Sequence, residues 1–188
     1  DHEPHGRGTL VDETAQGGTT YVGEVNHGVR NGRGTLRLHN SGAVFSGEWK
    51  SGTLTDGRCT YDDGGEYEGE LASDDAVAFV PHGSGSRTYA DGSRYDGDWR
   101  RGQRDGRGAA WLASGEEYEG AWLADRWSGK GTLRQPDGST YDGEFFGGQR
   151  HGAGHARFAD GSVYEGEWRD AVPDGVGNMY FGGAASEN

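Results

Sequence analysis

The fold is decided by one short stretch, Tyr118-Glu119-Gly120-Ala121-Trp122, together with the Gly129-Lys130-Gly131 that follows it. In both segments apolar or glycine residues alternate with polar ones, which is the period of a β-strand and not that of a helix. A short loop separates the two segments. The stretch therefore predicts a β-hairpin.

The same pattern recurs along the whole chain. Each repeat opens with an aromatic residue, has glycine two positions later, and ends in a second strand that usually carries Gly-x-Gly. Seven repeats begin at residues 21, 45, 67, 95, 118, 141 and 164. A half repeat covers 4–20, so we expect one repeat array over 4–182 and a piece of a longer array, because the chain begins in mid-repeat. The tail 183–188 leaves the pattern and is interpreted as a remnant of a tag or cleavage site.

A single hairpin is only marginally stable in water, so the hairpins are expected to stack in single file. The predicted fold class is all-β: an array of hairpins that forms one long, right-handedly twisted antiparallel sheet. The aromatic columns form its core, and the rings of each repeat are expected to lie in the glycine furrow of the next. Both glycines of Gly-x-Gly are expected to face these rings. A groove of aromatic side chains for carbohydrate or proline is the alternative.

Composition narrows the function. The chain has 188 residues, a net charge of -13 and only 31% hydrophobic residues, which alone would indicate disorder. Its 38 glycines and 11% aromatic residues argue instead for packed strands. The acidic balance argues against nucleic acid, and no apolar run reaches the length of a membrane span. The single cysteine, Cys59, excludes an internal disulfide and fits a reducing compartment.

These repeats resemble the MORN (membrane occupation and recognition nexus) family. The match is carried by Tyr118 to Gly131 with the following Asp137-Gly138-Ser139, and equally by Tyr95-Asp96-Gly97-Asp98-Trp99 with Gly106-Arg107-Gly108. The resemblance implies a hairpin sheet and mostly scaffolding functions near membranes. A chain of repeats alone looks most like the cytoskeletal scaffolds of protists. It therefore implies a non-enzymatic, membrane-associated cytoskeletal scaffold in the cytoplasm near the plasma membrane, acting through cytoskeletal or other protein partners.

Homodimerisation through the C-terminal repeats is a further expectation. The last strand is apolar where an unpaired edge strand would be expected to carry charge. The basic residue inside Gly-x-Gly is also lost in the last two repeats. The predicted dimer contacts, in an isologous two-fold arrangement, are Ala153, Phe158, Val176, Met179, Tyr180 and Phe181. A strand capped by its own tail is the alternative.

Two aromatic residues lie outside the repeat columns, Trp111 and Trp127, and the sequence leaves two interpretations of them open: ordinary packing, or contact with a protein partner. Residues 74–81 insert into one hairpin loop, where Phe79 either folds back on the sheet or serves as part of a hinge or partner loop. The repeat that opens at Phe45 is irregular, with Cys59 where the second glycine is expected. The face away from the rings carries regularly spaced acids and bases, which indicates a solvated, charge-paired surface or a face for a cationic partner.

Direct binding of phosphoinositide or another anionic lipid is the alternative function. Arginines gather near the predicted hairpin ends, where they could contact head groups, although the net charge opposes this. These arginines are Arg30, Arg100, Arg101, Arg104, Arg126 and Arg150.

Nothing in the sequence supports catalysis. The glycines do not form a phosphate-binding loop, and no histidine lies next to Cys59 to activate it. His151 and His155 are four residues apart on a strand, about 13 Å, which is too far to share one zinc ion. We therefore expect no enzyme, no cofactor and no structural metal. An adventitious or chain-bridging metal has one candidate group at the start of the chain, Asp1, His2 and His5.

Overall fold

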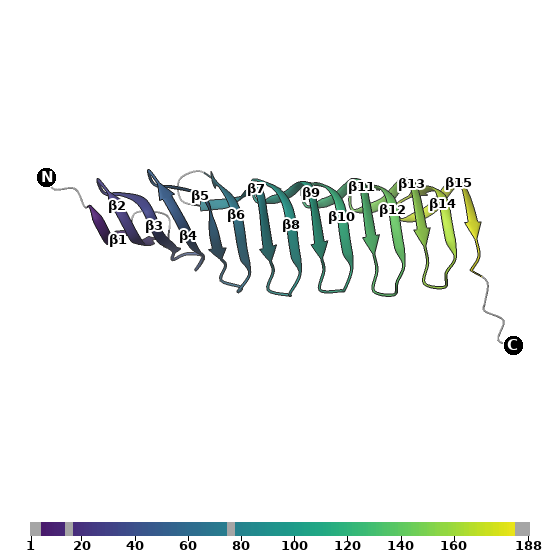
Figure 1. Cartoon of the computed structure of the whole chain (residues 1–188), viewed down its shortest axis with the longest axis horizontal. Coiled ribbons are helices and arrows are strands. Elements are labelled where there is room, and N and C mark those ends of the chain that lie inside the picture. The colour runs from purple at the N-terminus through teal and green to yellow at the C-terminus, as the bar shows by residue number, and fades with distance from the viewer. Residues whose placement is uncertain (1–4, 14–16, 75–77, 183–188) are drawn as a thin grey trace. The chain divides into compact units, whose positions relative to one another are not determined.

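The computed structural model describes the chain except for residues 1–4, 14–16, 75–77 and 183–188. The described residues form strands, turns and loops, and the strands follow one another in chain order as neighbours in a single open antiparallel sheet (Figure 1). This confirms the predicted all-β array of hairpins. The strands are β1 (Gly6–Asp12), β2 (Thr19–Asn26), β3 (Val29–Leu38), β4 (Val44–Lys50), β5 (Thr53–Thr60), β6 (Glu66–Asp74), β7 (Ala78–Thr88), β8 (Arg94–Arg100), β9 (Gln103–Trp111), β10 (Glu117–Leu123), β11 (Arg126–Arg134), β12 (Thr140–Phe146), β13 (Gln149–Arg157), β14 (Val163–Arg169) and β15 (Val172–Tyr180).

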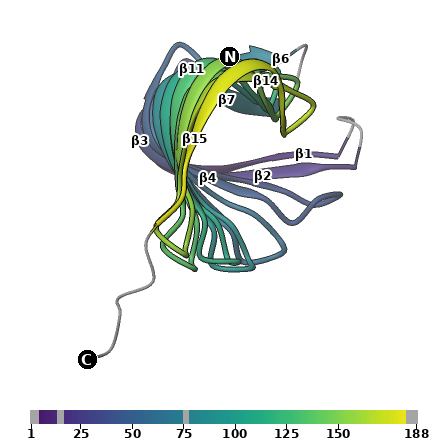
Figure 2. The ribbon, with the colours of Figure 1, turned by 90° about the vertical axis from the view of Figure 1, so that its right-hand side faces the viewer.

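The chain divides into two compact units. The N-terminal unit comprises Asp1–Gly92 with Asp98–Gln103, and the C-terminal unit comprises Ser93–Gly97 with Arg104–Asn188. Each is built from the same kind of hairpin, in which the opening aromatic is the second or third residue of the first strand. Strands such as β15 curve strongly along their length (Figure 2).

The two glycines of Gly-x-Gly have different roles, which corrects the expectation that both face the rings. The second one, Gly34 in β3, lies under the ring and hydroxyl of Tyr21 from the paired strand β2. The first, Gly32, has a left-handed φ of 84° and lies beside the Glu24 carboxylate at a bulge in the ladder. One glycine makes room for an aromatic ring, and the other permits the bulge.

The direction of ring packing also differs from the prediction. Tyr21 covers a glycine of its own hairpin, and its hydroxyl donates a hydrogen bond to the Glu24 carbonyl at 2.8 Å. Trp49 reaches back to the preceding hairpin, where its indole N–H donates to the Gly34 carbonyl at 3.0 Å. The rings of Tyr21 and Trp49 meet edge to face, 5.4 Å apart. The furrow at Gly34 is thus shared by a tyrosine of its own hairpin and a tryptophan of the next.

Four tryptophans make this indole bond to a glycine carbonyl in the hairpin before them. The pairs are Trp49 with Gly34, Trp99 with Gly85, Trp122 with Gly108 and Trp168 with Gly154. All four tryptophans are buried. The bond satisfies the one polar atom of an otherwise apolar side chain, which lets tryptophan serve as a core residue.

The irregular repeat is also corrected by the structure. Gly57, not Cys59, occupies the column of the second glycine, because it pairs with Gly47. Cys59 pairs with Phe45 and takes the buried place that Leu36 takes opposite Tyr21. The hairpin that starts at Phe45 therefore has fewer residues at its bulge than the hairpin that starts at Tyr21. When the repeats are aligned by their opening aromatic residues, its second strand is out of step with the others.

The turns at the hairpin ends use left-handed backbone, usually with glycine at the second position. Asp170 and Ala171 fill such a turn instead, with φ of 50° and 70°. The Ala171→Gly substitution is expected to raise the free energy of unfolding by about 1 kcal/mol, because left-handed backbone costs an L-residue about that much. Chemical denaturation measures the effect.

A second turn supplies the control. Asp125 is also left-handed, but its carboxylate pairs with the Arg104 guanidinium at 3.0 Å. Asp125→Gly relieves the backbone and removes this pair, so it is expected to gain less than Ala171→Gly. A loss of stability in Ala171→Gly would contradict the assignment of strain to that turn.

Candidate functional site

The face away from the rings carries pairs of opposite charge between neighbouring strands. Arg58 and Glu68 lie 2.9 Å apart, and Arg33 lies 3.8 Å from Glu48. All four side chains are largely exposed, so each pair adds little to stability. The face is charged and solvated. The sequence left two interpretations of it open, a solvated, charge-paired surface and a face for a cationic partner.

One set of acids on this face has a structural role that sequence reasoning missed. The Glu70 carboxylate accepts a hydrogen bond from the Ser84 backbone N–H at 3.1 Å, and Glu167 accepts one from Val176 at 3.3 Å. Both glutamates stand three residues after the opening tyrosine, opposite the bulge. The signal was present in the sequence as a recurrent acid between the glycine and the apolar residue that closes the first strand, as in Gly69-Glu70-Leu71 and Gly166-Glu167-Trp168.

The described residues hold no group of three or more His, Cys, Asp or Glu placed to bind a metal ion. Asp1 and His2 lie outside the described residues, while the His5 ring contacts the His27 ring at 4.3 Å. Cys59 is buried, and this burial raises the pKa of its thiol to about 11. A thiol with that pKa is a poor nucleophile at neutral pH.

The six arginines expected at a lipid-facing edge divide into two groups. Three of them lie over tryptophan rings of the following hairpin: Arg30 on Trp49 at 4.7 Å, Arg104 on Trp122 at 4.3 Å and Arg150 on Trp168 at 4.7 Å. Burial lowers the pKa of both Arg30 and Arg150. The other three, Arg100, Arg101 and Arg126, are exposed. Half of the expected edge charge is therefore part of the packing.

The aromatic residues outside the columns are placed differently from one another. Trp127 stacks on Tyr118 with ring centres 4.7 Å apart, in the position that Arg104 and Arg150 take in neighbouring hairpins. Phe79 is buried against Phe45 and Trp49, at 5.6 and 5.4 Å, so it folds back on the sheet. Packing accounts for both residues.

Trp111 remains 41% exposed, with the Arg94 guanidinium 5.6 Å from its ring centre. Two further exposed apolar residues, Leu123 and Phe146, lie at hairpin ends and were missed by the sequence reasoning. Their signal was weak, since isolated apolar residues on the outer parity of a strand are common.

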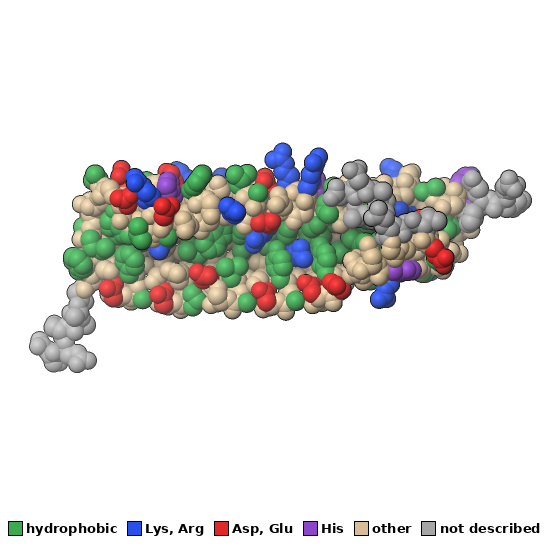
Figure 3. All heavy atoms as spheres, turned by 180° about the vertical axis from the view of Figure 1, so that it is seen from behind, with side chains coloured by type: hydrophobic (Ala, Val, Ile, Leu, Met, Phe, Trp, Pro, Cys, Tyr) green, Lys and Arg blue, Asp and Glu red, His purple; other side chains and the backbone are tan. Residues whose placement is uncertain are grey.

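The C-terminal strand is the most exposed apolar element of the C-terminal unit. Every residue of β15 is exposed, including Val176 at 82%, and Phe181 just beyond it is 85% exposed. Figure 3 shows hydrophobic side chains exposed along this face, including at the C-terminal end of the sheet. The remaining predicted dimer residues are less uniform: Ala153 is exposed and Phe158 is half-buried.

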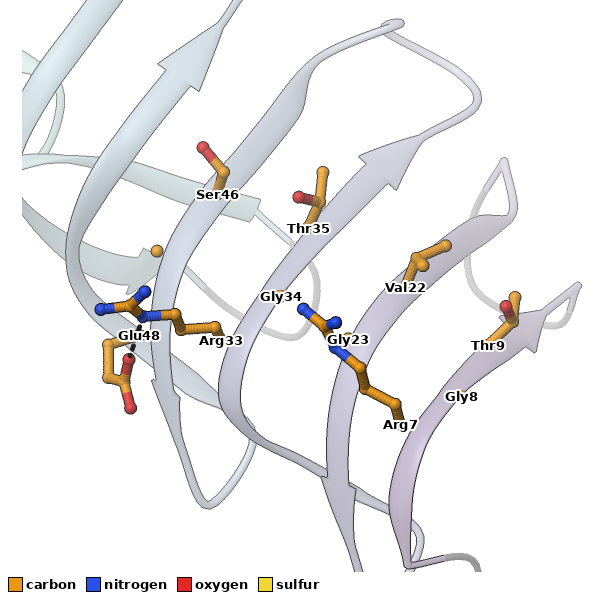
Figure 4. A pocket seen from close by; sticks show the side chains of 11 residues that line it. Arg7, Gly8, Thr9, Val22, Gly23, Arg33, Gly34, Thr35, Ser46 and Glu48 are labelled. Atoms are coloured by element: carbon orange, nitrogen blue, oxygen red, sulfur yellow. Dashed lines mark ion pairs between the residues drawn. The ribbon is translucent and has the colours of Figure 1, made fainter.

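The outer face also carries two open troughs whose floor is glycine backbone. One lies in the C-terminal unit and has a volume of about 1160 Å³, with Glu119, Asp142 and Lys130 among its lining residues. The other crosses β1 to β4 in the N-terminal unit and has a volume of about 790 Å³ (Figure 4). We call the latter the N-terminal trough; its walls are formed by Arg7, Thr9, Val22, Arg33, Thr35, Ser46 and Glu48.

Comparison with known proteins gives one clear family. The MORN repeat model matches residues 21–42, 80–94, 95–116, 118–140, 141–163 and 164–183. No relative is found among curated proteins.

Among solved structures, the chain is similar to the wild-type TCP10 domain of Danio rerio CPAP in complex with a peptide of Danio rerio STIL. The two share 15% identity with a TM-score of 0.46, over 85% of this chain and 68% of that one. This likeness is too distant to carry an argument. The described residues form no helix that could span a membrane.

The MORN repeat is a non-enzymatic repeat module of protein- or membrane-interaction proteins. Its model covers more than half of the residues, and the hairpins carry its tyrosine, glycine and tryptophan positions. The chain belongs to the MORN repeat family.

Proposed function

We propose that the chain is a structural scaffold of a membrane-associated cytoskeletal assembly, that it works in the cytoplasm near the plasma membrane, and that it dimerises through its C-terminal repeats. The observation that carries the dimer is the exposed apolar edge of β15. Residues 176–181 of this edge contain no charged side chain, whereas Asp174 and Pro173 protect the strand's first half. Charge and proline are what edge strands use to avoid pairing.

Comparison with internal strands shows what a partner would supply. Met179 pairs with Tyr164 as Ala156 pairs with Tyr141, yet Ala156 is 2% exposed and Met179 is 41% exposed. The difference is the cover that the following hairpin gives to Ala156. A second β15, antiparallel to the first, would cover Met179 and pair the free backbone groups in an isologous contact.

Of the six arginines expected at a lipid-facing edge, the alternative, direct binding of anionic lipid, retains Arg100, Arg101 and Arg126 as exposed side chains. Protein partners therefore fit the described surface better than a lipid head group.

Light scattering after size exclusion tests the dimer on the full chain at high micromolar concentration. The wild-type chain is expected to be a dimer, and the double variant Met179→Lys/Phe181→Lys a monomer, because two lysines on each copy would face one another. Leu123→Lys/Phe146→Lys is the matched control, since it adds the same two charges to exposed apolar sites at the ends of β10 and β12. A monomeric wild type, or equal dissociation by Leu123→Lys/Phe146→Lys, would sink this part of the proposal.

A further inference from the structure

The N-terminal trough differs in charge from the rest of the outer face. Its first wall consists of Thr9, Val22, Thr35 and Ser46, none of which is charged. In the later hairpins the residue after the opening tyrosine, which corresponds to Val22, is an acid: Glu68, Asp96, Glu119, Asp142 and Glu165. The trough is therefore a local departure from the repeat pattern, and general features of the fold do not explain it.

The second wall of the trough supplies positive charge. The side chains of Arg7 and Arg33 run over the glycine floor in the same direction (Figure 4). Among the side chains drawn there, the one ion pair joins Arg33 to Glu48 at 3.8 Å, and both partners are largely exposed. Such a long, solvated contact is weak, so both guanidinium groups are available to a ligand.

We propose that the N-terminal trough binds an extended acidic peptide, with carboxylates on Arg7 and Arg33 and its backbone along the hydroxyl wall. Guanidinium groups bind carboxylates through paired, charge-assisted hydrogen bonds. Hydroxyl groups both donate and accept, so Thr9, Thr35 and Ser46 can serve the unpaired backbone groups of an extended chain.

The spacing of the two arginines indicates the conformation of the peptide. Arg7 lies in β1 and Arg33 in β3, which places them two strands, or about 9.6 Å, apart. A polyproline II helix repeats every three residues, about 9.3 Å, whereas alternate residues of a β-strand are only about 6.6 Å apart. The geometry therefore fits an acidic residue at every third position of a polyproline II segment.

The net charge of -13 does not forbid this contact. Exposed charges are screened over about 8 Å at physiological ionic strength, so the local arginines dominate the field inside the trough. Glu48 is the one acid that lines it and competes for Arg33. Removing that charge should strengthen binding.

Fluorescence anisotropy with the full chain and a labelled (Glu-Pro-Pro)₃ peptide tests the site. Binding is expected to fall with salt, to weaken about tenfold in Arg7→Gln/Arg33→Gln as two exposed carboxylate contacts are lost, and to strengthen about threefold in Glu48→Gln. The matched control is Arg107→Gln/Lys130→Gln, which removes the same charge from the trough of the C-terminal unit and should leave the affinity unchanged.

Two further probes decide whether the site reads charge. (Gln-Pro-Pro)₃ should bind more weakly and (Lys-Pro-Pro)₃ should not bind. Absent binding of the glutamate peptide, tighter binding of the lysine peptide, or equal losses in the two double variants would each overturn the proposal. Because the dimer contacts proposed above lie in β15, light scattering on Arg7→Gln/Arg33→Gln reports on dimerisation separately.

Discussion

The Gly34→Ala substitution is expected to lower the free energy of unfolding by about 3 kcal/mol, at the upper end of what overpacking usually costs. A Cβ at this position would collide with the hydroxyl and ring of Tyr21. The ring cannot move away freely, because Tyr21 is buried and its hydroxyl is bonded to the Glu24 carbonyl. Chemical denaturation followed by tryptophan fluorescence measures the loss.

Gly8→Ala is the matched control. Gly8 belongs to the same glycine column and the same unit, but nothing lies within 4 Å of the Cβ that alanine would add. Neither glycine has a left-handed φ, so a difference in backbone strain does not separate the two variants. We expect Gly8→Ala to be neutral or slightly stabilising. Equal destabilisation by both changes would mean that the ring is not what requires glycine.

The Trp122→Ala substitution is expected to cost about 4 kcal/mol, as is usual for a buried aromatic side chain. The indole contacts Tyr95 and Tyr118 edge to face, each at 5.2 Å. It also donates to the Gly108 carbonyl at 3.0 Å and lies under the Arg104 guanidinium. Its removal leaves a cavity, takes the indole hydrogen bond from the Gly108 carbonyl and removes the ring that lies under the Arg104 guanidinium. Thermal and chemical denaturation should both show the change.

Trp111→Ala is the control for this second effect. Trp111 lies in β9 of the same unit but is 41% exposed and outside the repeat column. Its loss is expected to cost about 1 kcal/mol or less, since surface substitutions rarely cost more. If the two tryptophan variants unfold at the same denaturant concentration, the column is not the core.

The spacing of tyrosine, glycine and tryptophan sufficed to predict the hairpins, because period two and a short loop allow few other structures. It could not reveal which hairpin a ring covers. Tyr21 and Trp49 both face the same furrow, one from within its own hairpin and one from the next. Periodicity reports the face of a side chain and not its reach along the sheet. Periodicity also missed the role of Gly32. A bulge shifts the register at that point, so the residues there no longer follow the simple alternation of faces.

The surface was harder to predict than the core. Arg30, Arg104 and Arg150 were interpreted as edge charges, although their long side chains cover tryptophan rings. Arginine combines an apolar stem and a flat cation, so its sequence context alone does not separate packing from exposure. The signal that was available is their fixed position nine residues after the opening tyrosine, which Trp127 also occupies.

Hydrogen exchange of the six indole N–H groups, followed one by one by NMR, tests most directly whether rings of one hairpin are bonded to the glycine furrow of the one before. The four that donate to glycine carbonyls should be strongly protected: Trp49, Trp99, Trp122 and Trp168. Trp111 should exchange at nearly the rate of a free indole, because it lies at the surface. Rapid exchange of all six indoles would contradict the account.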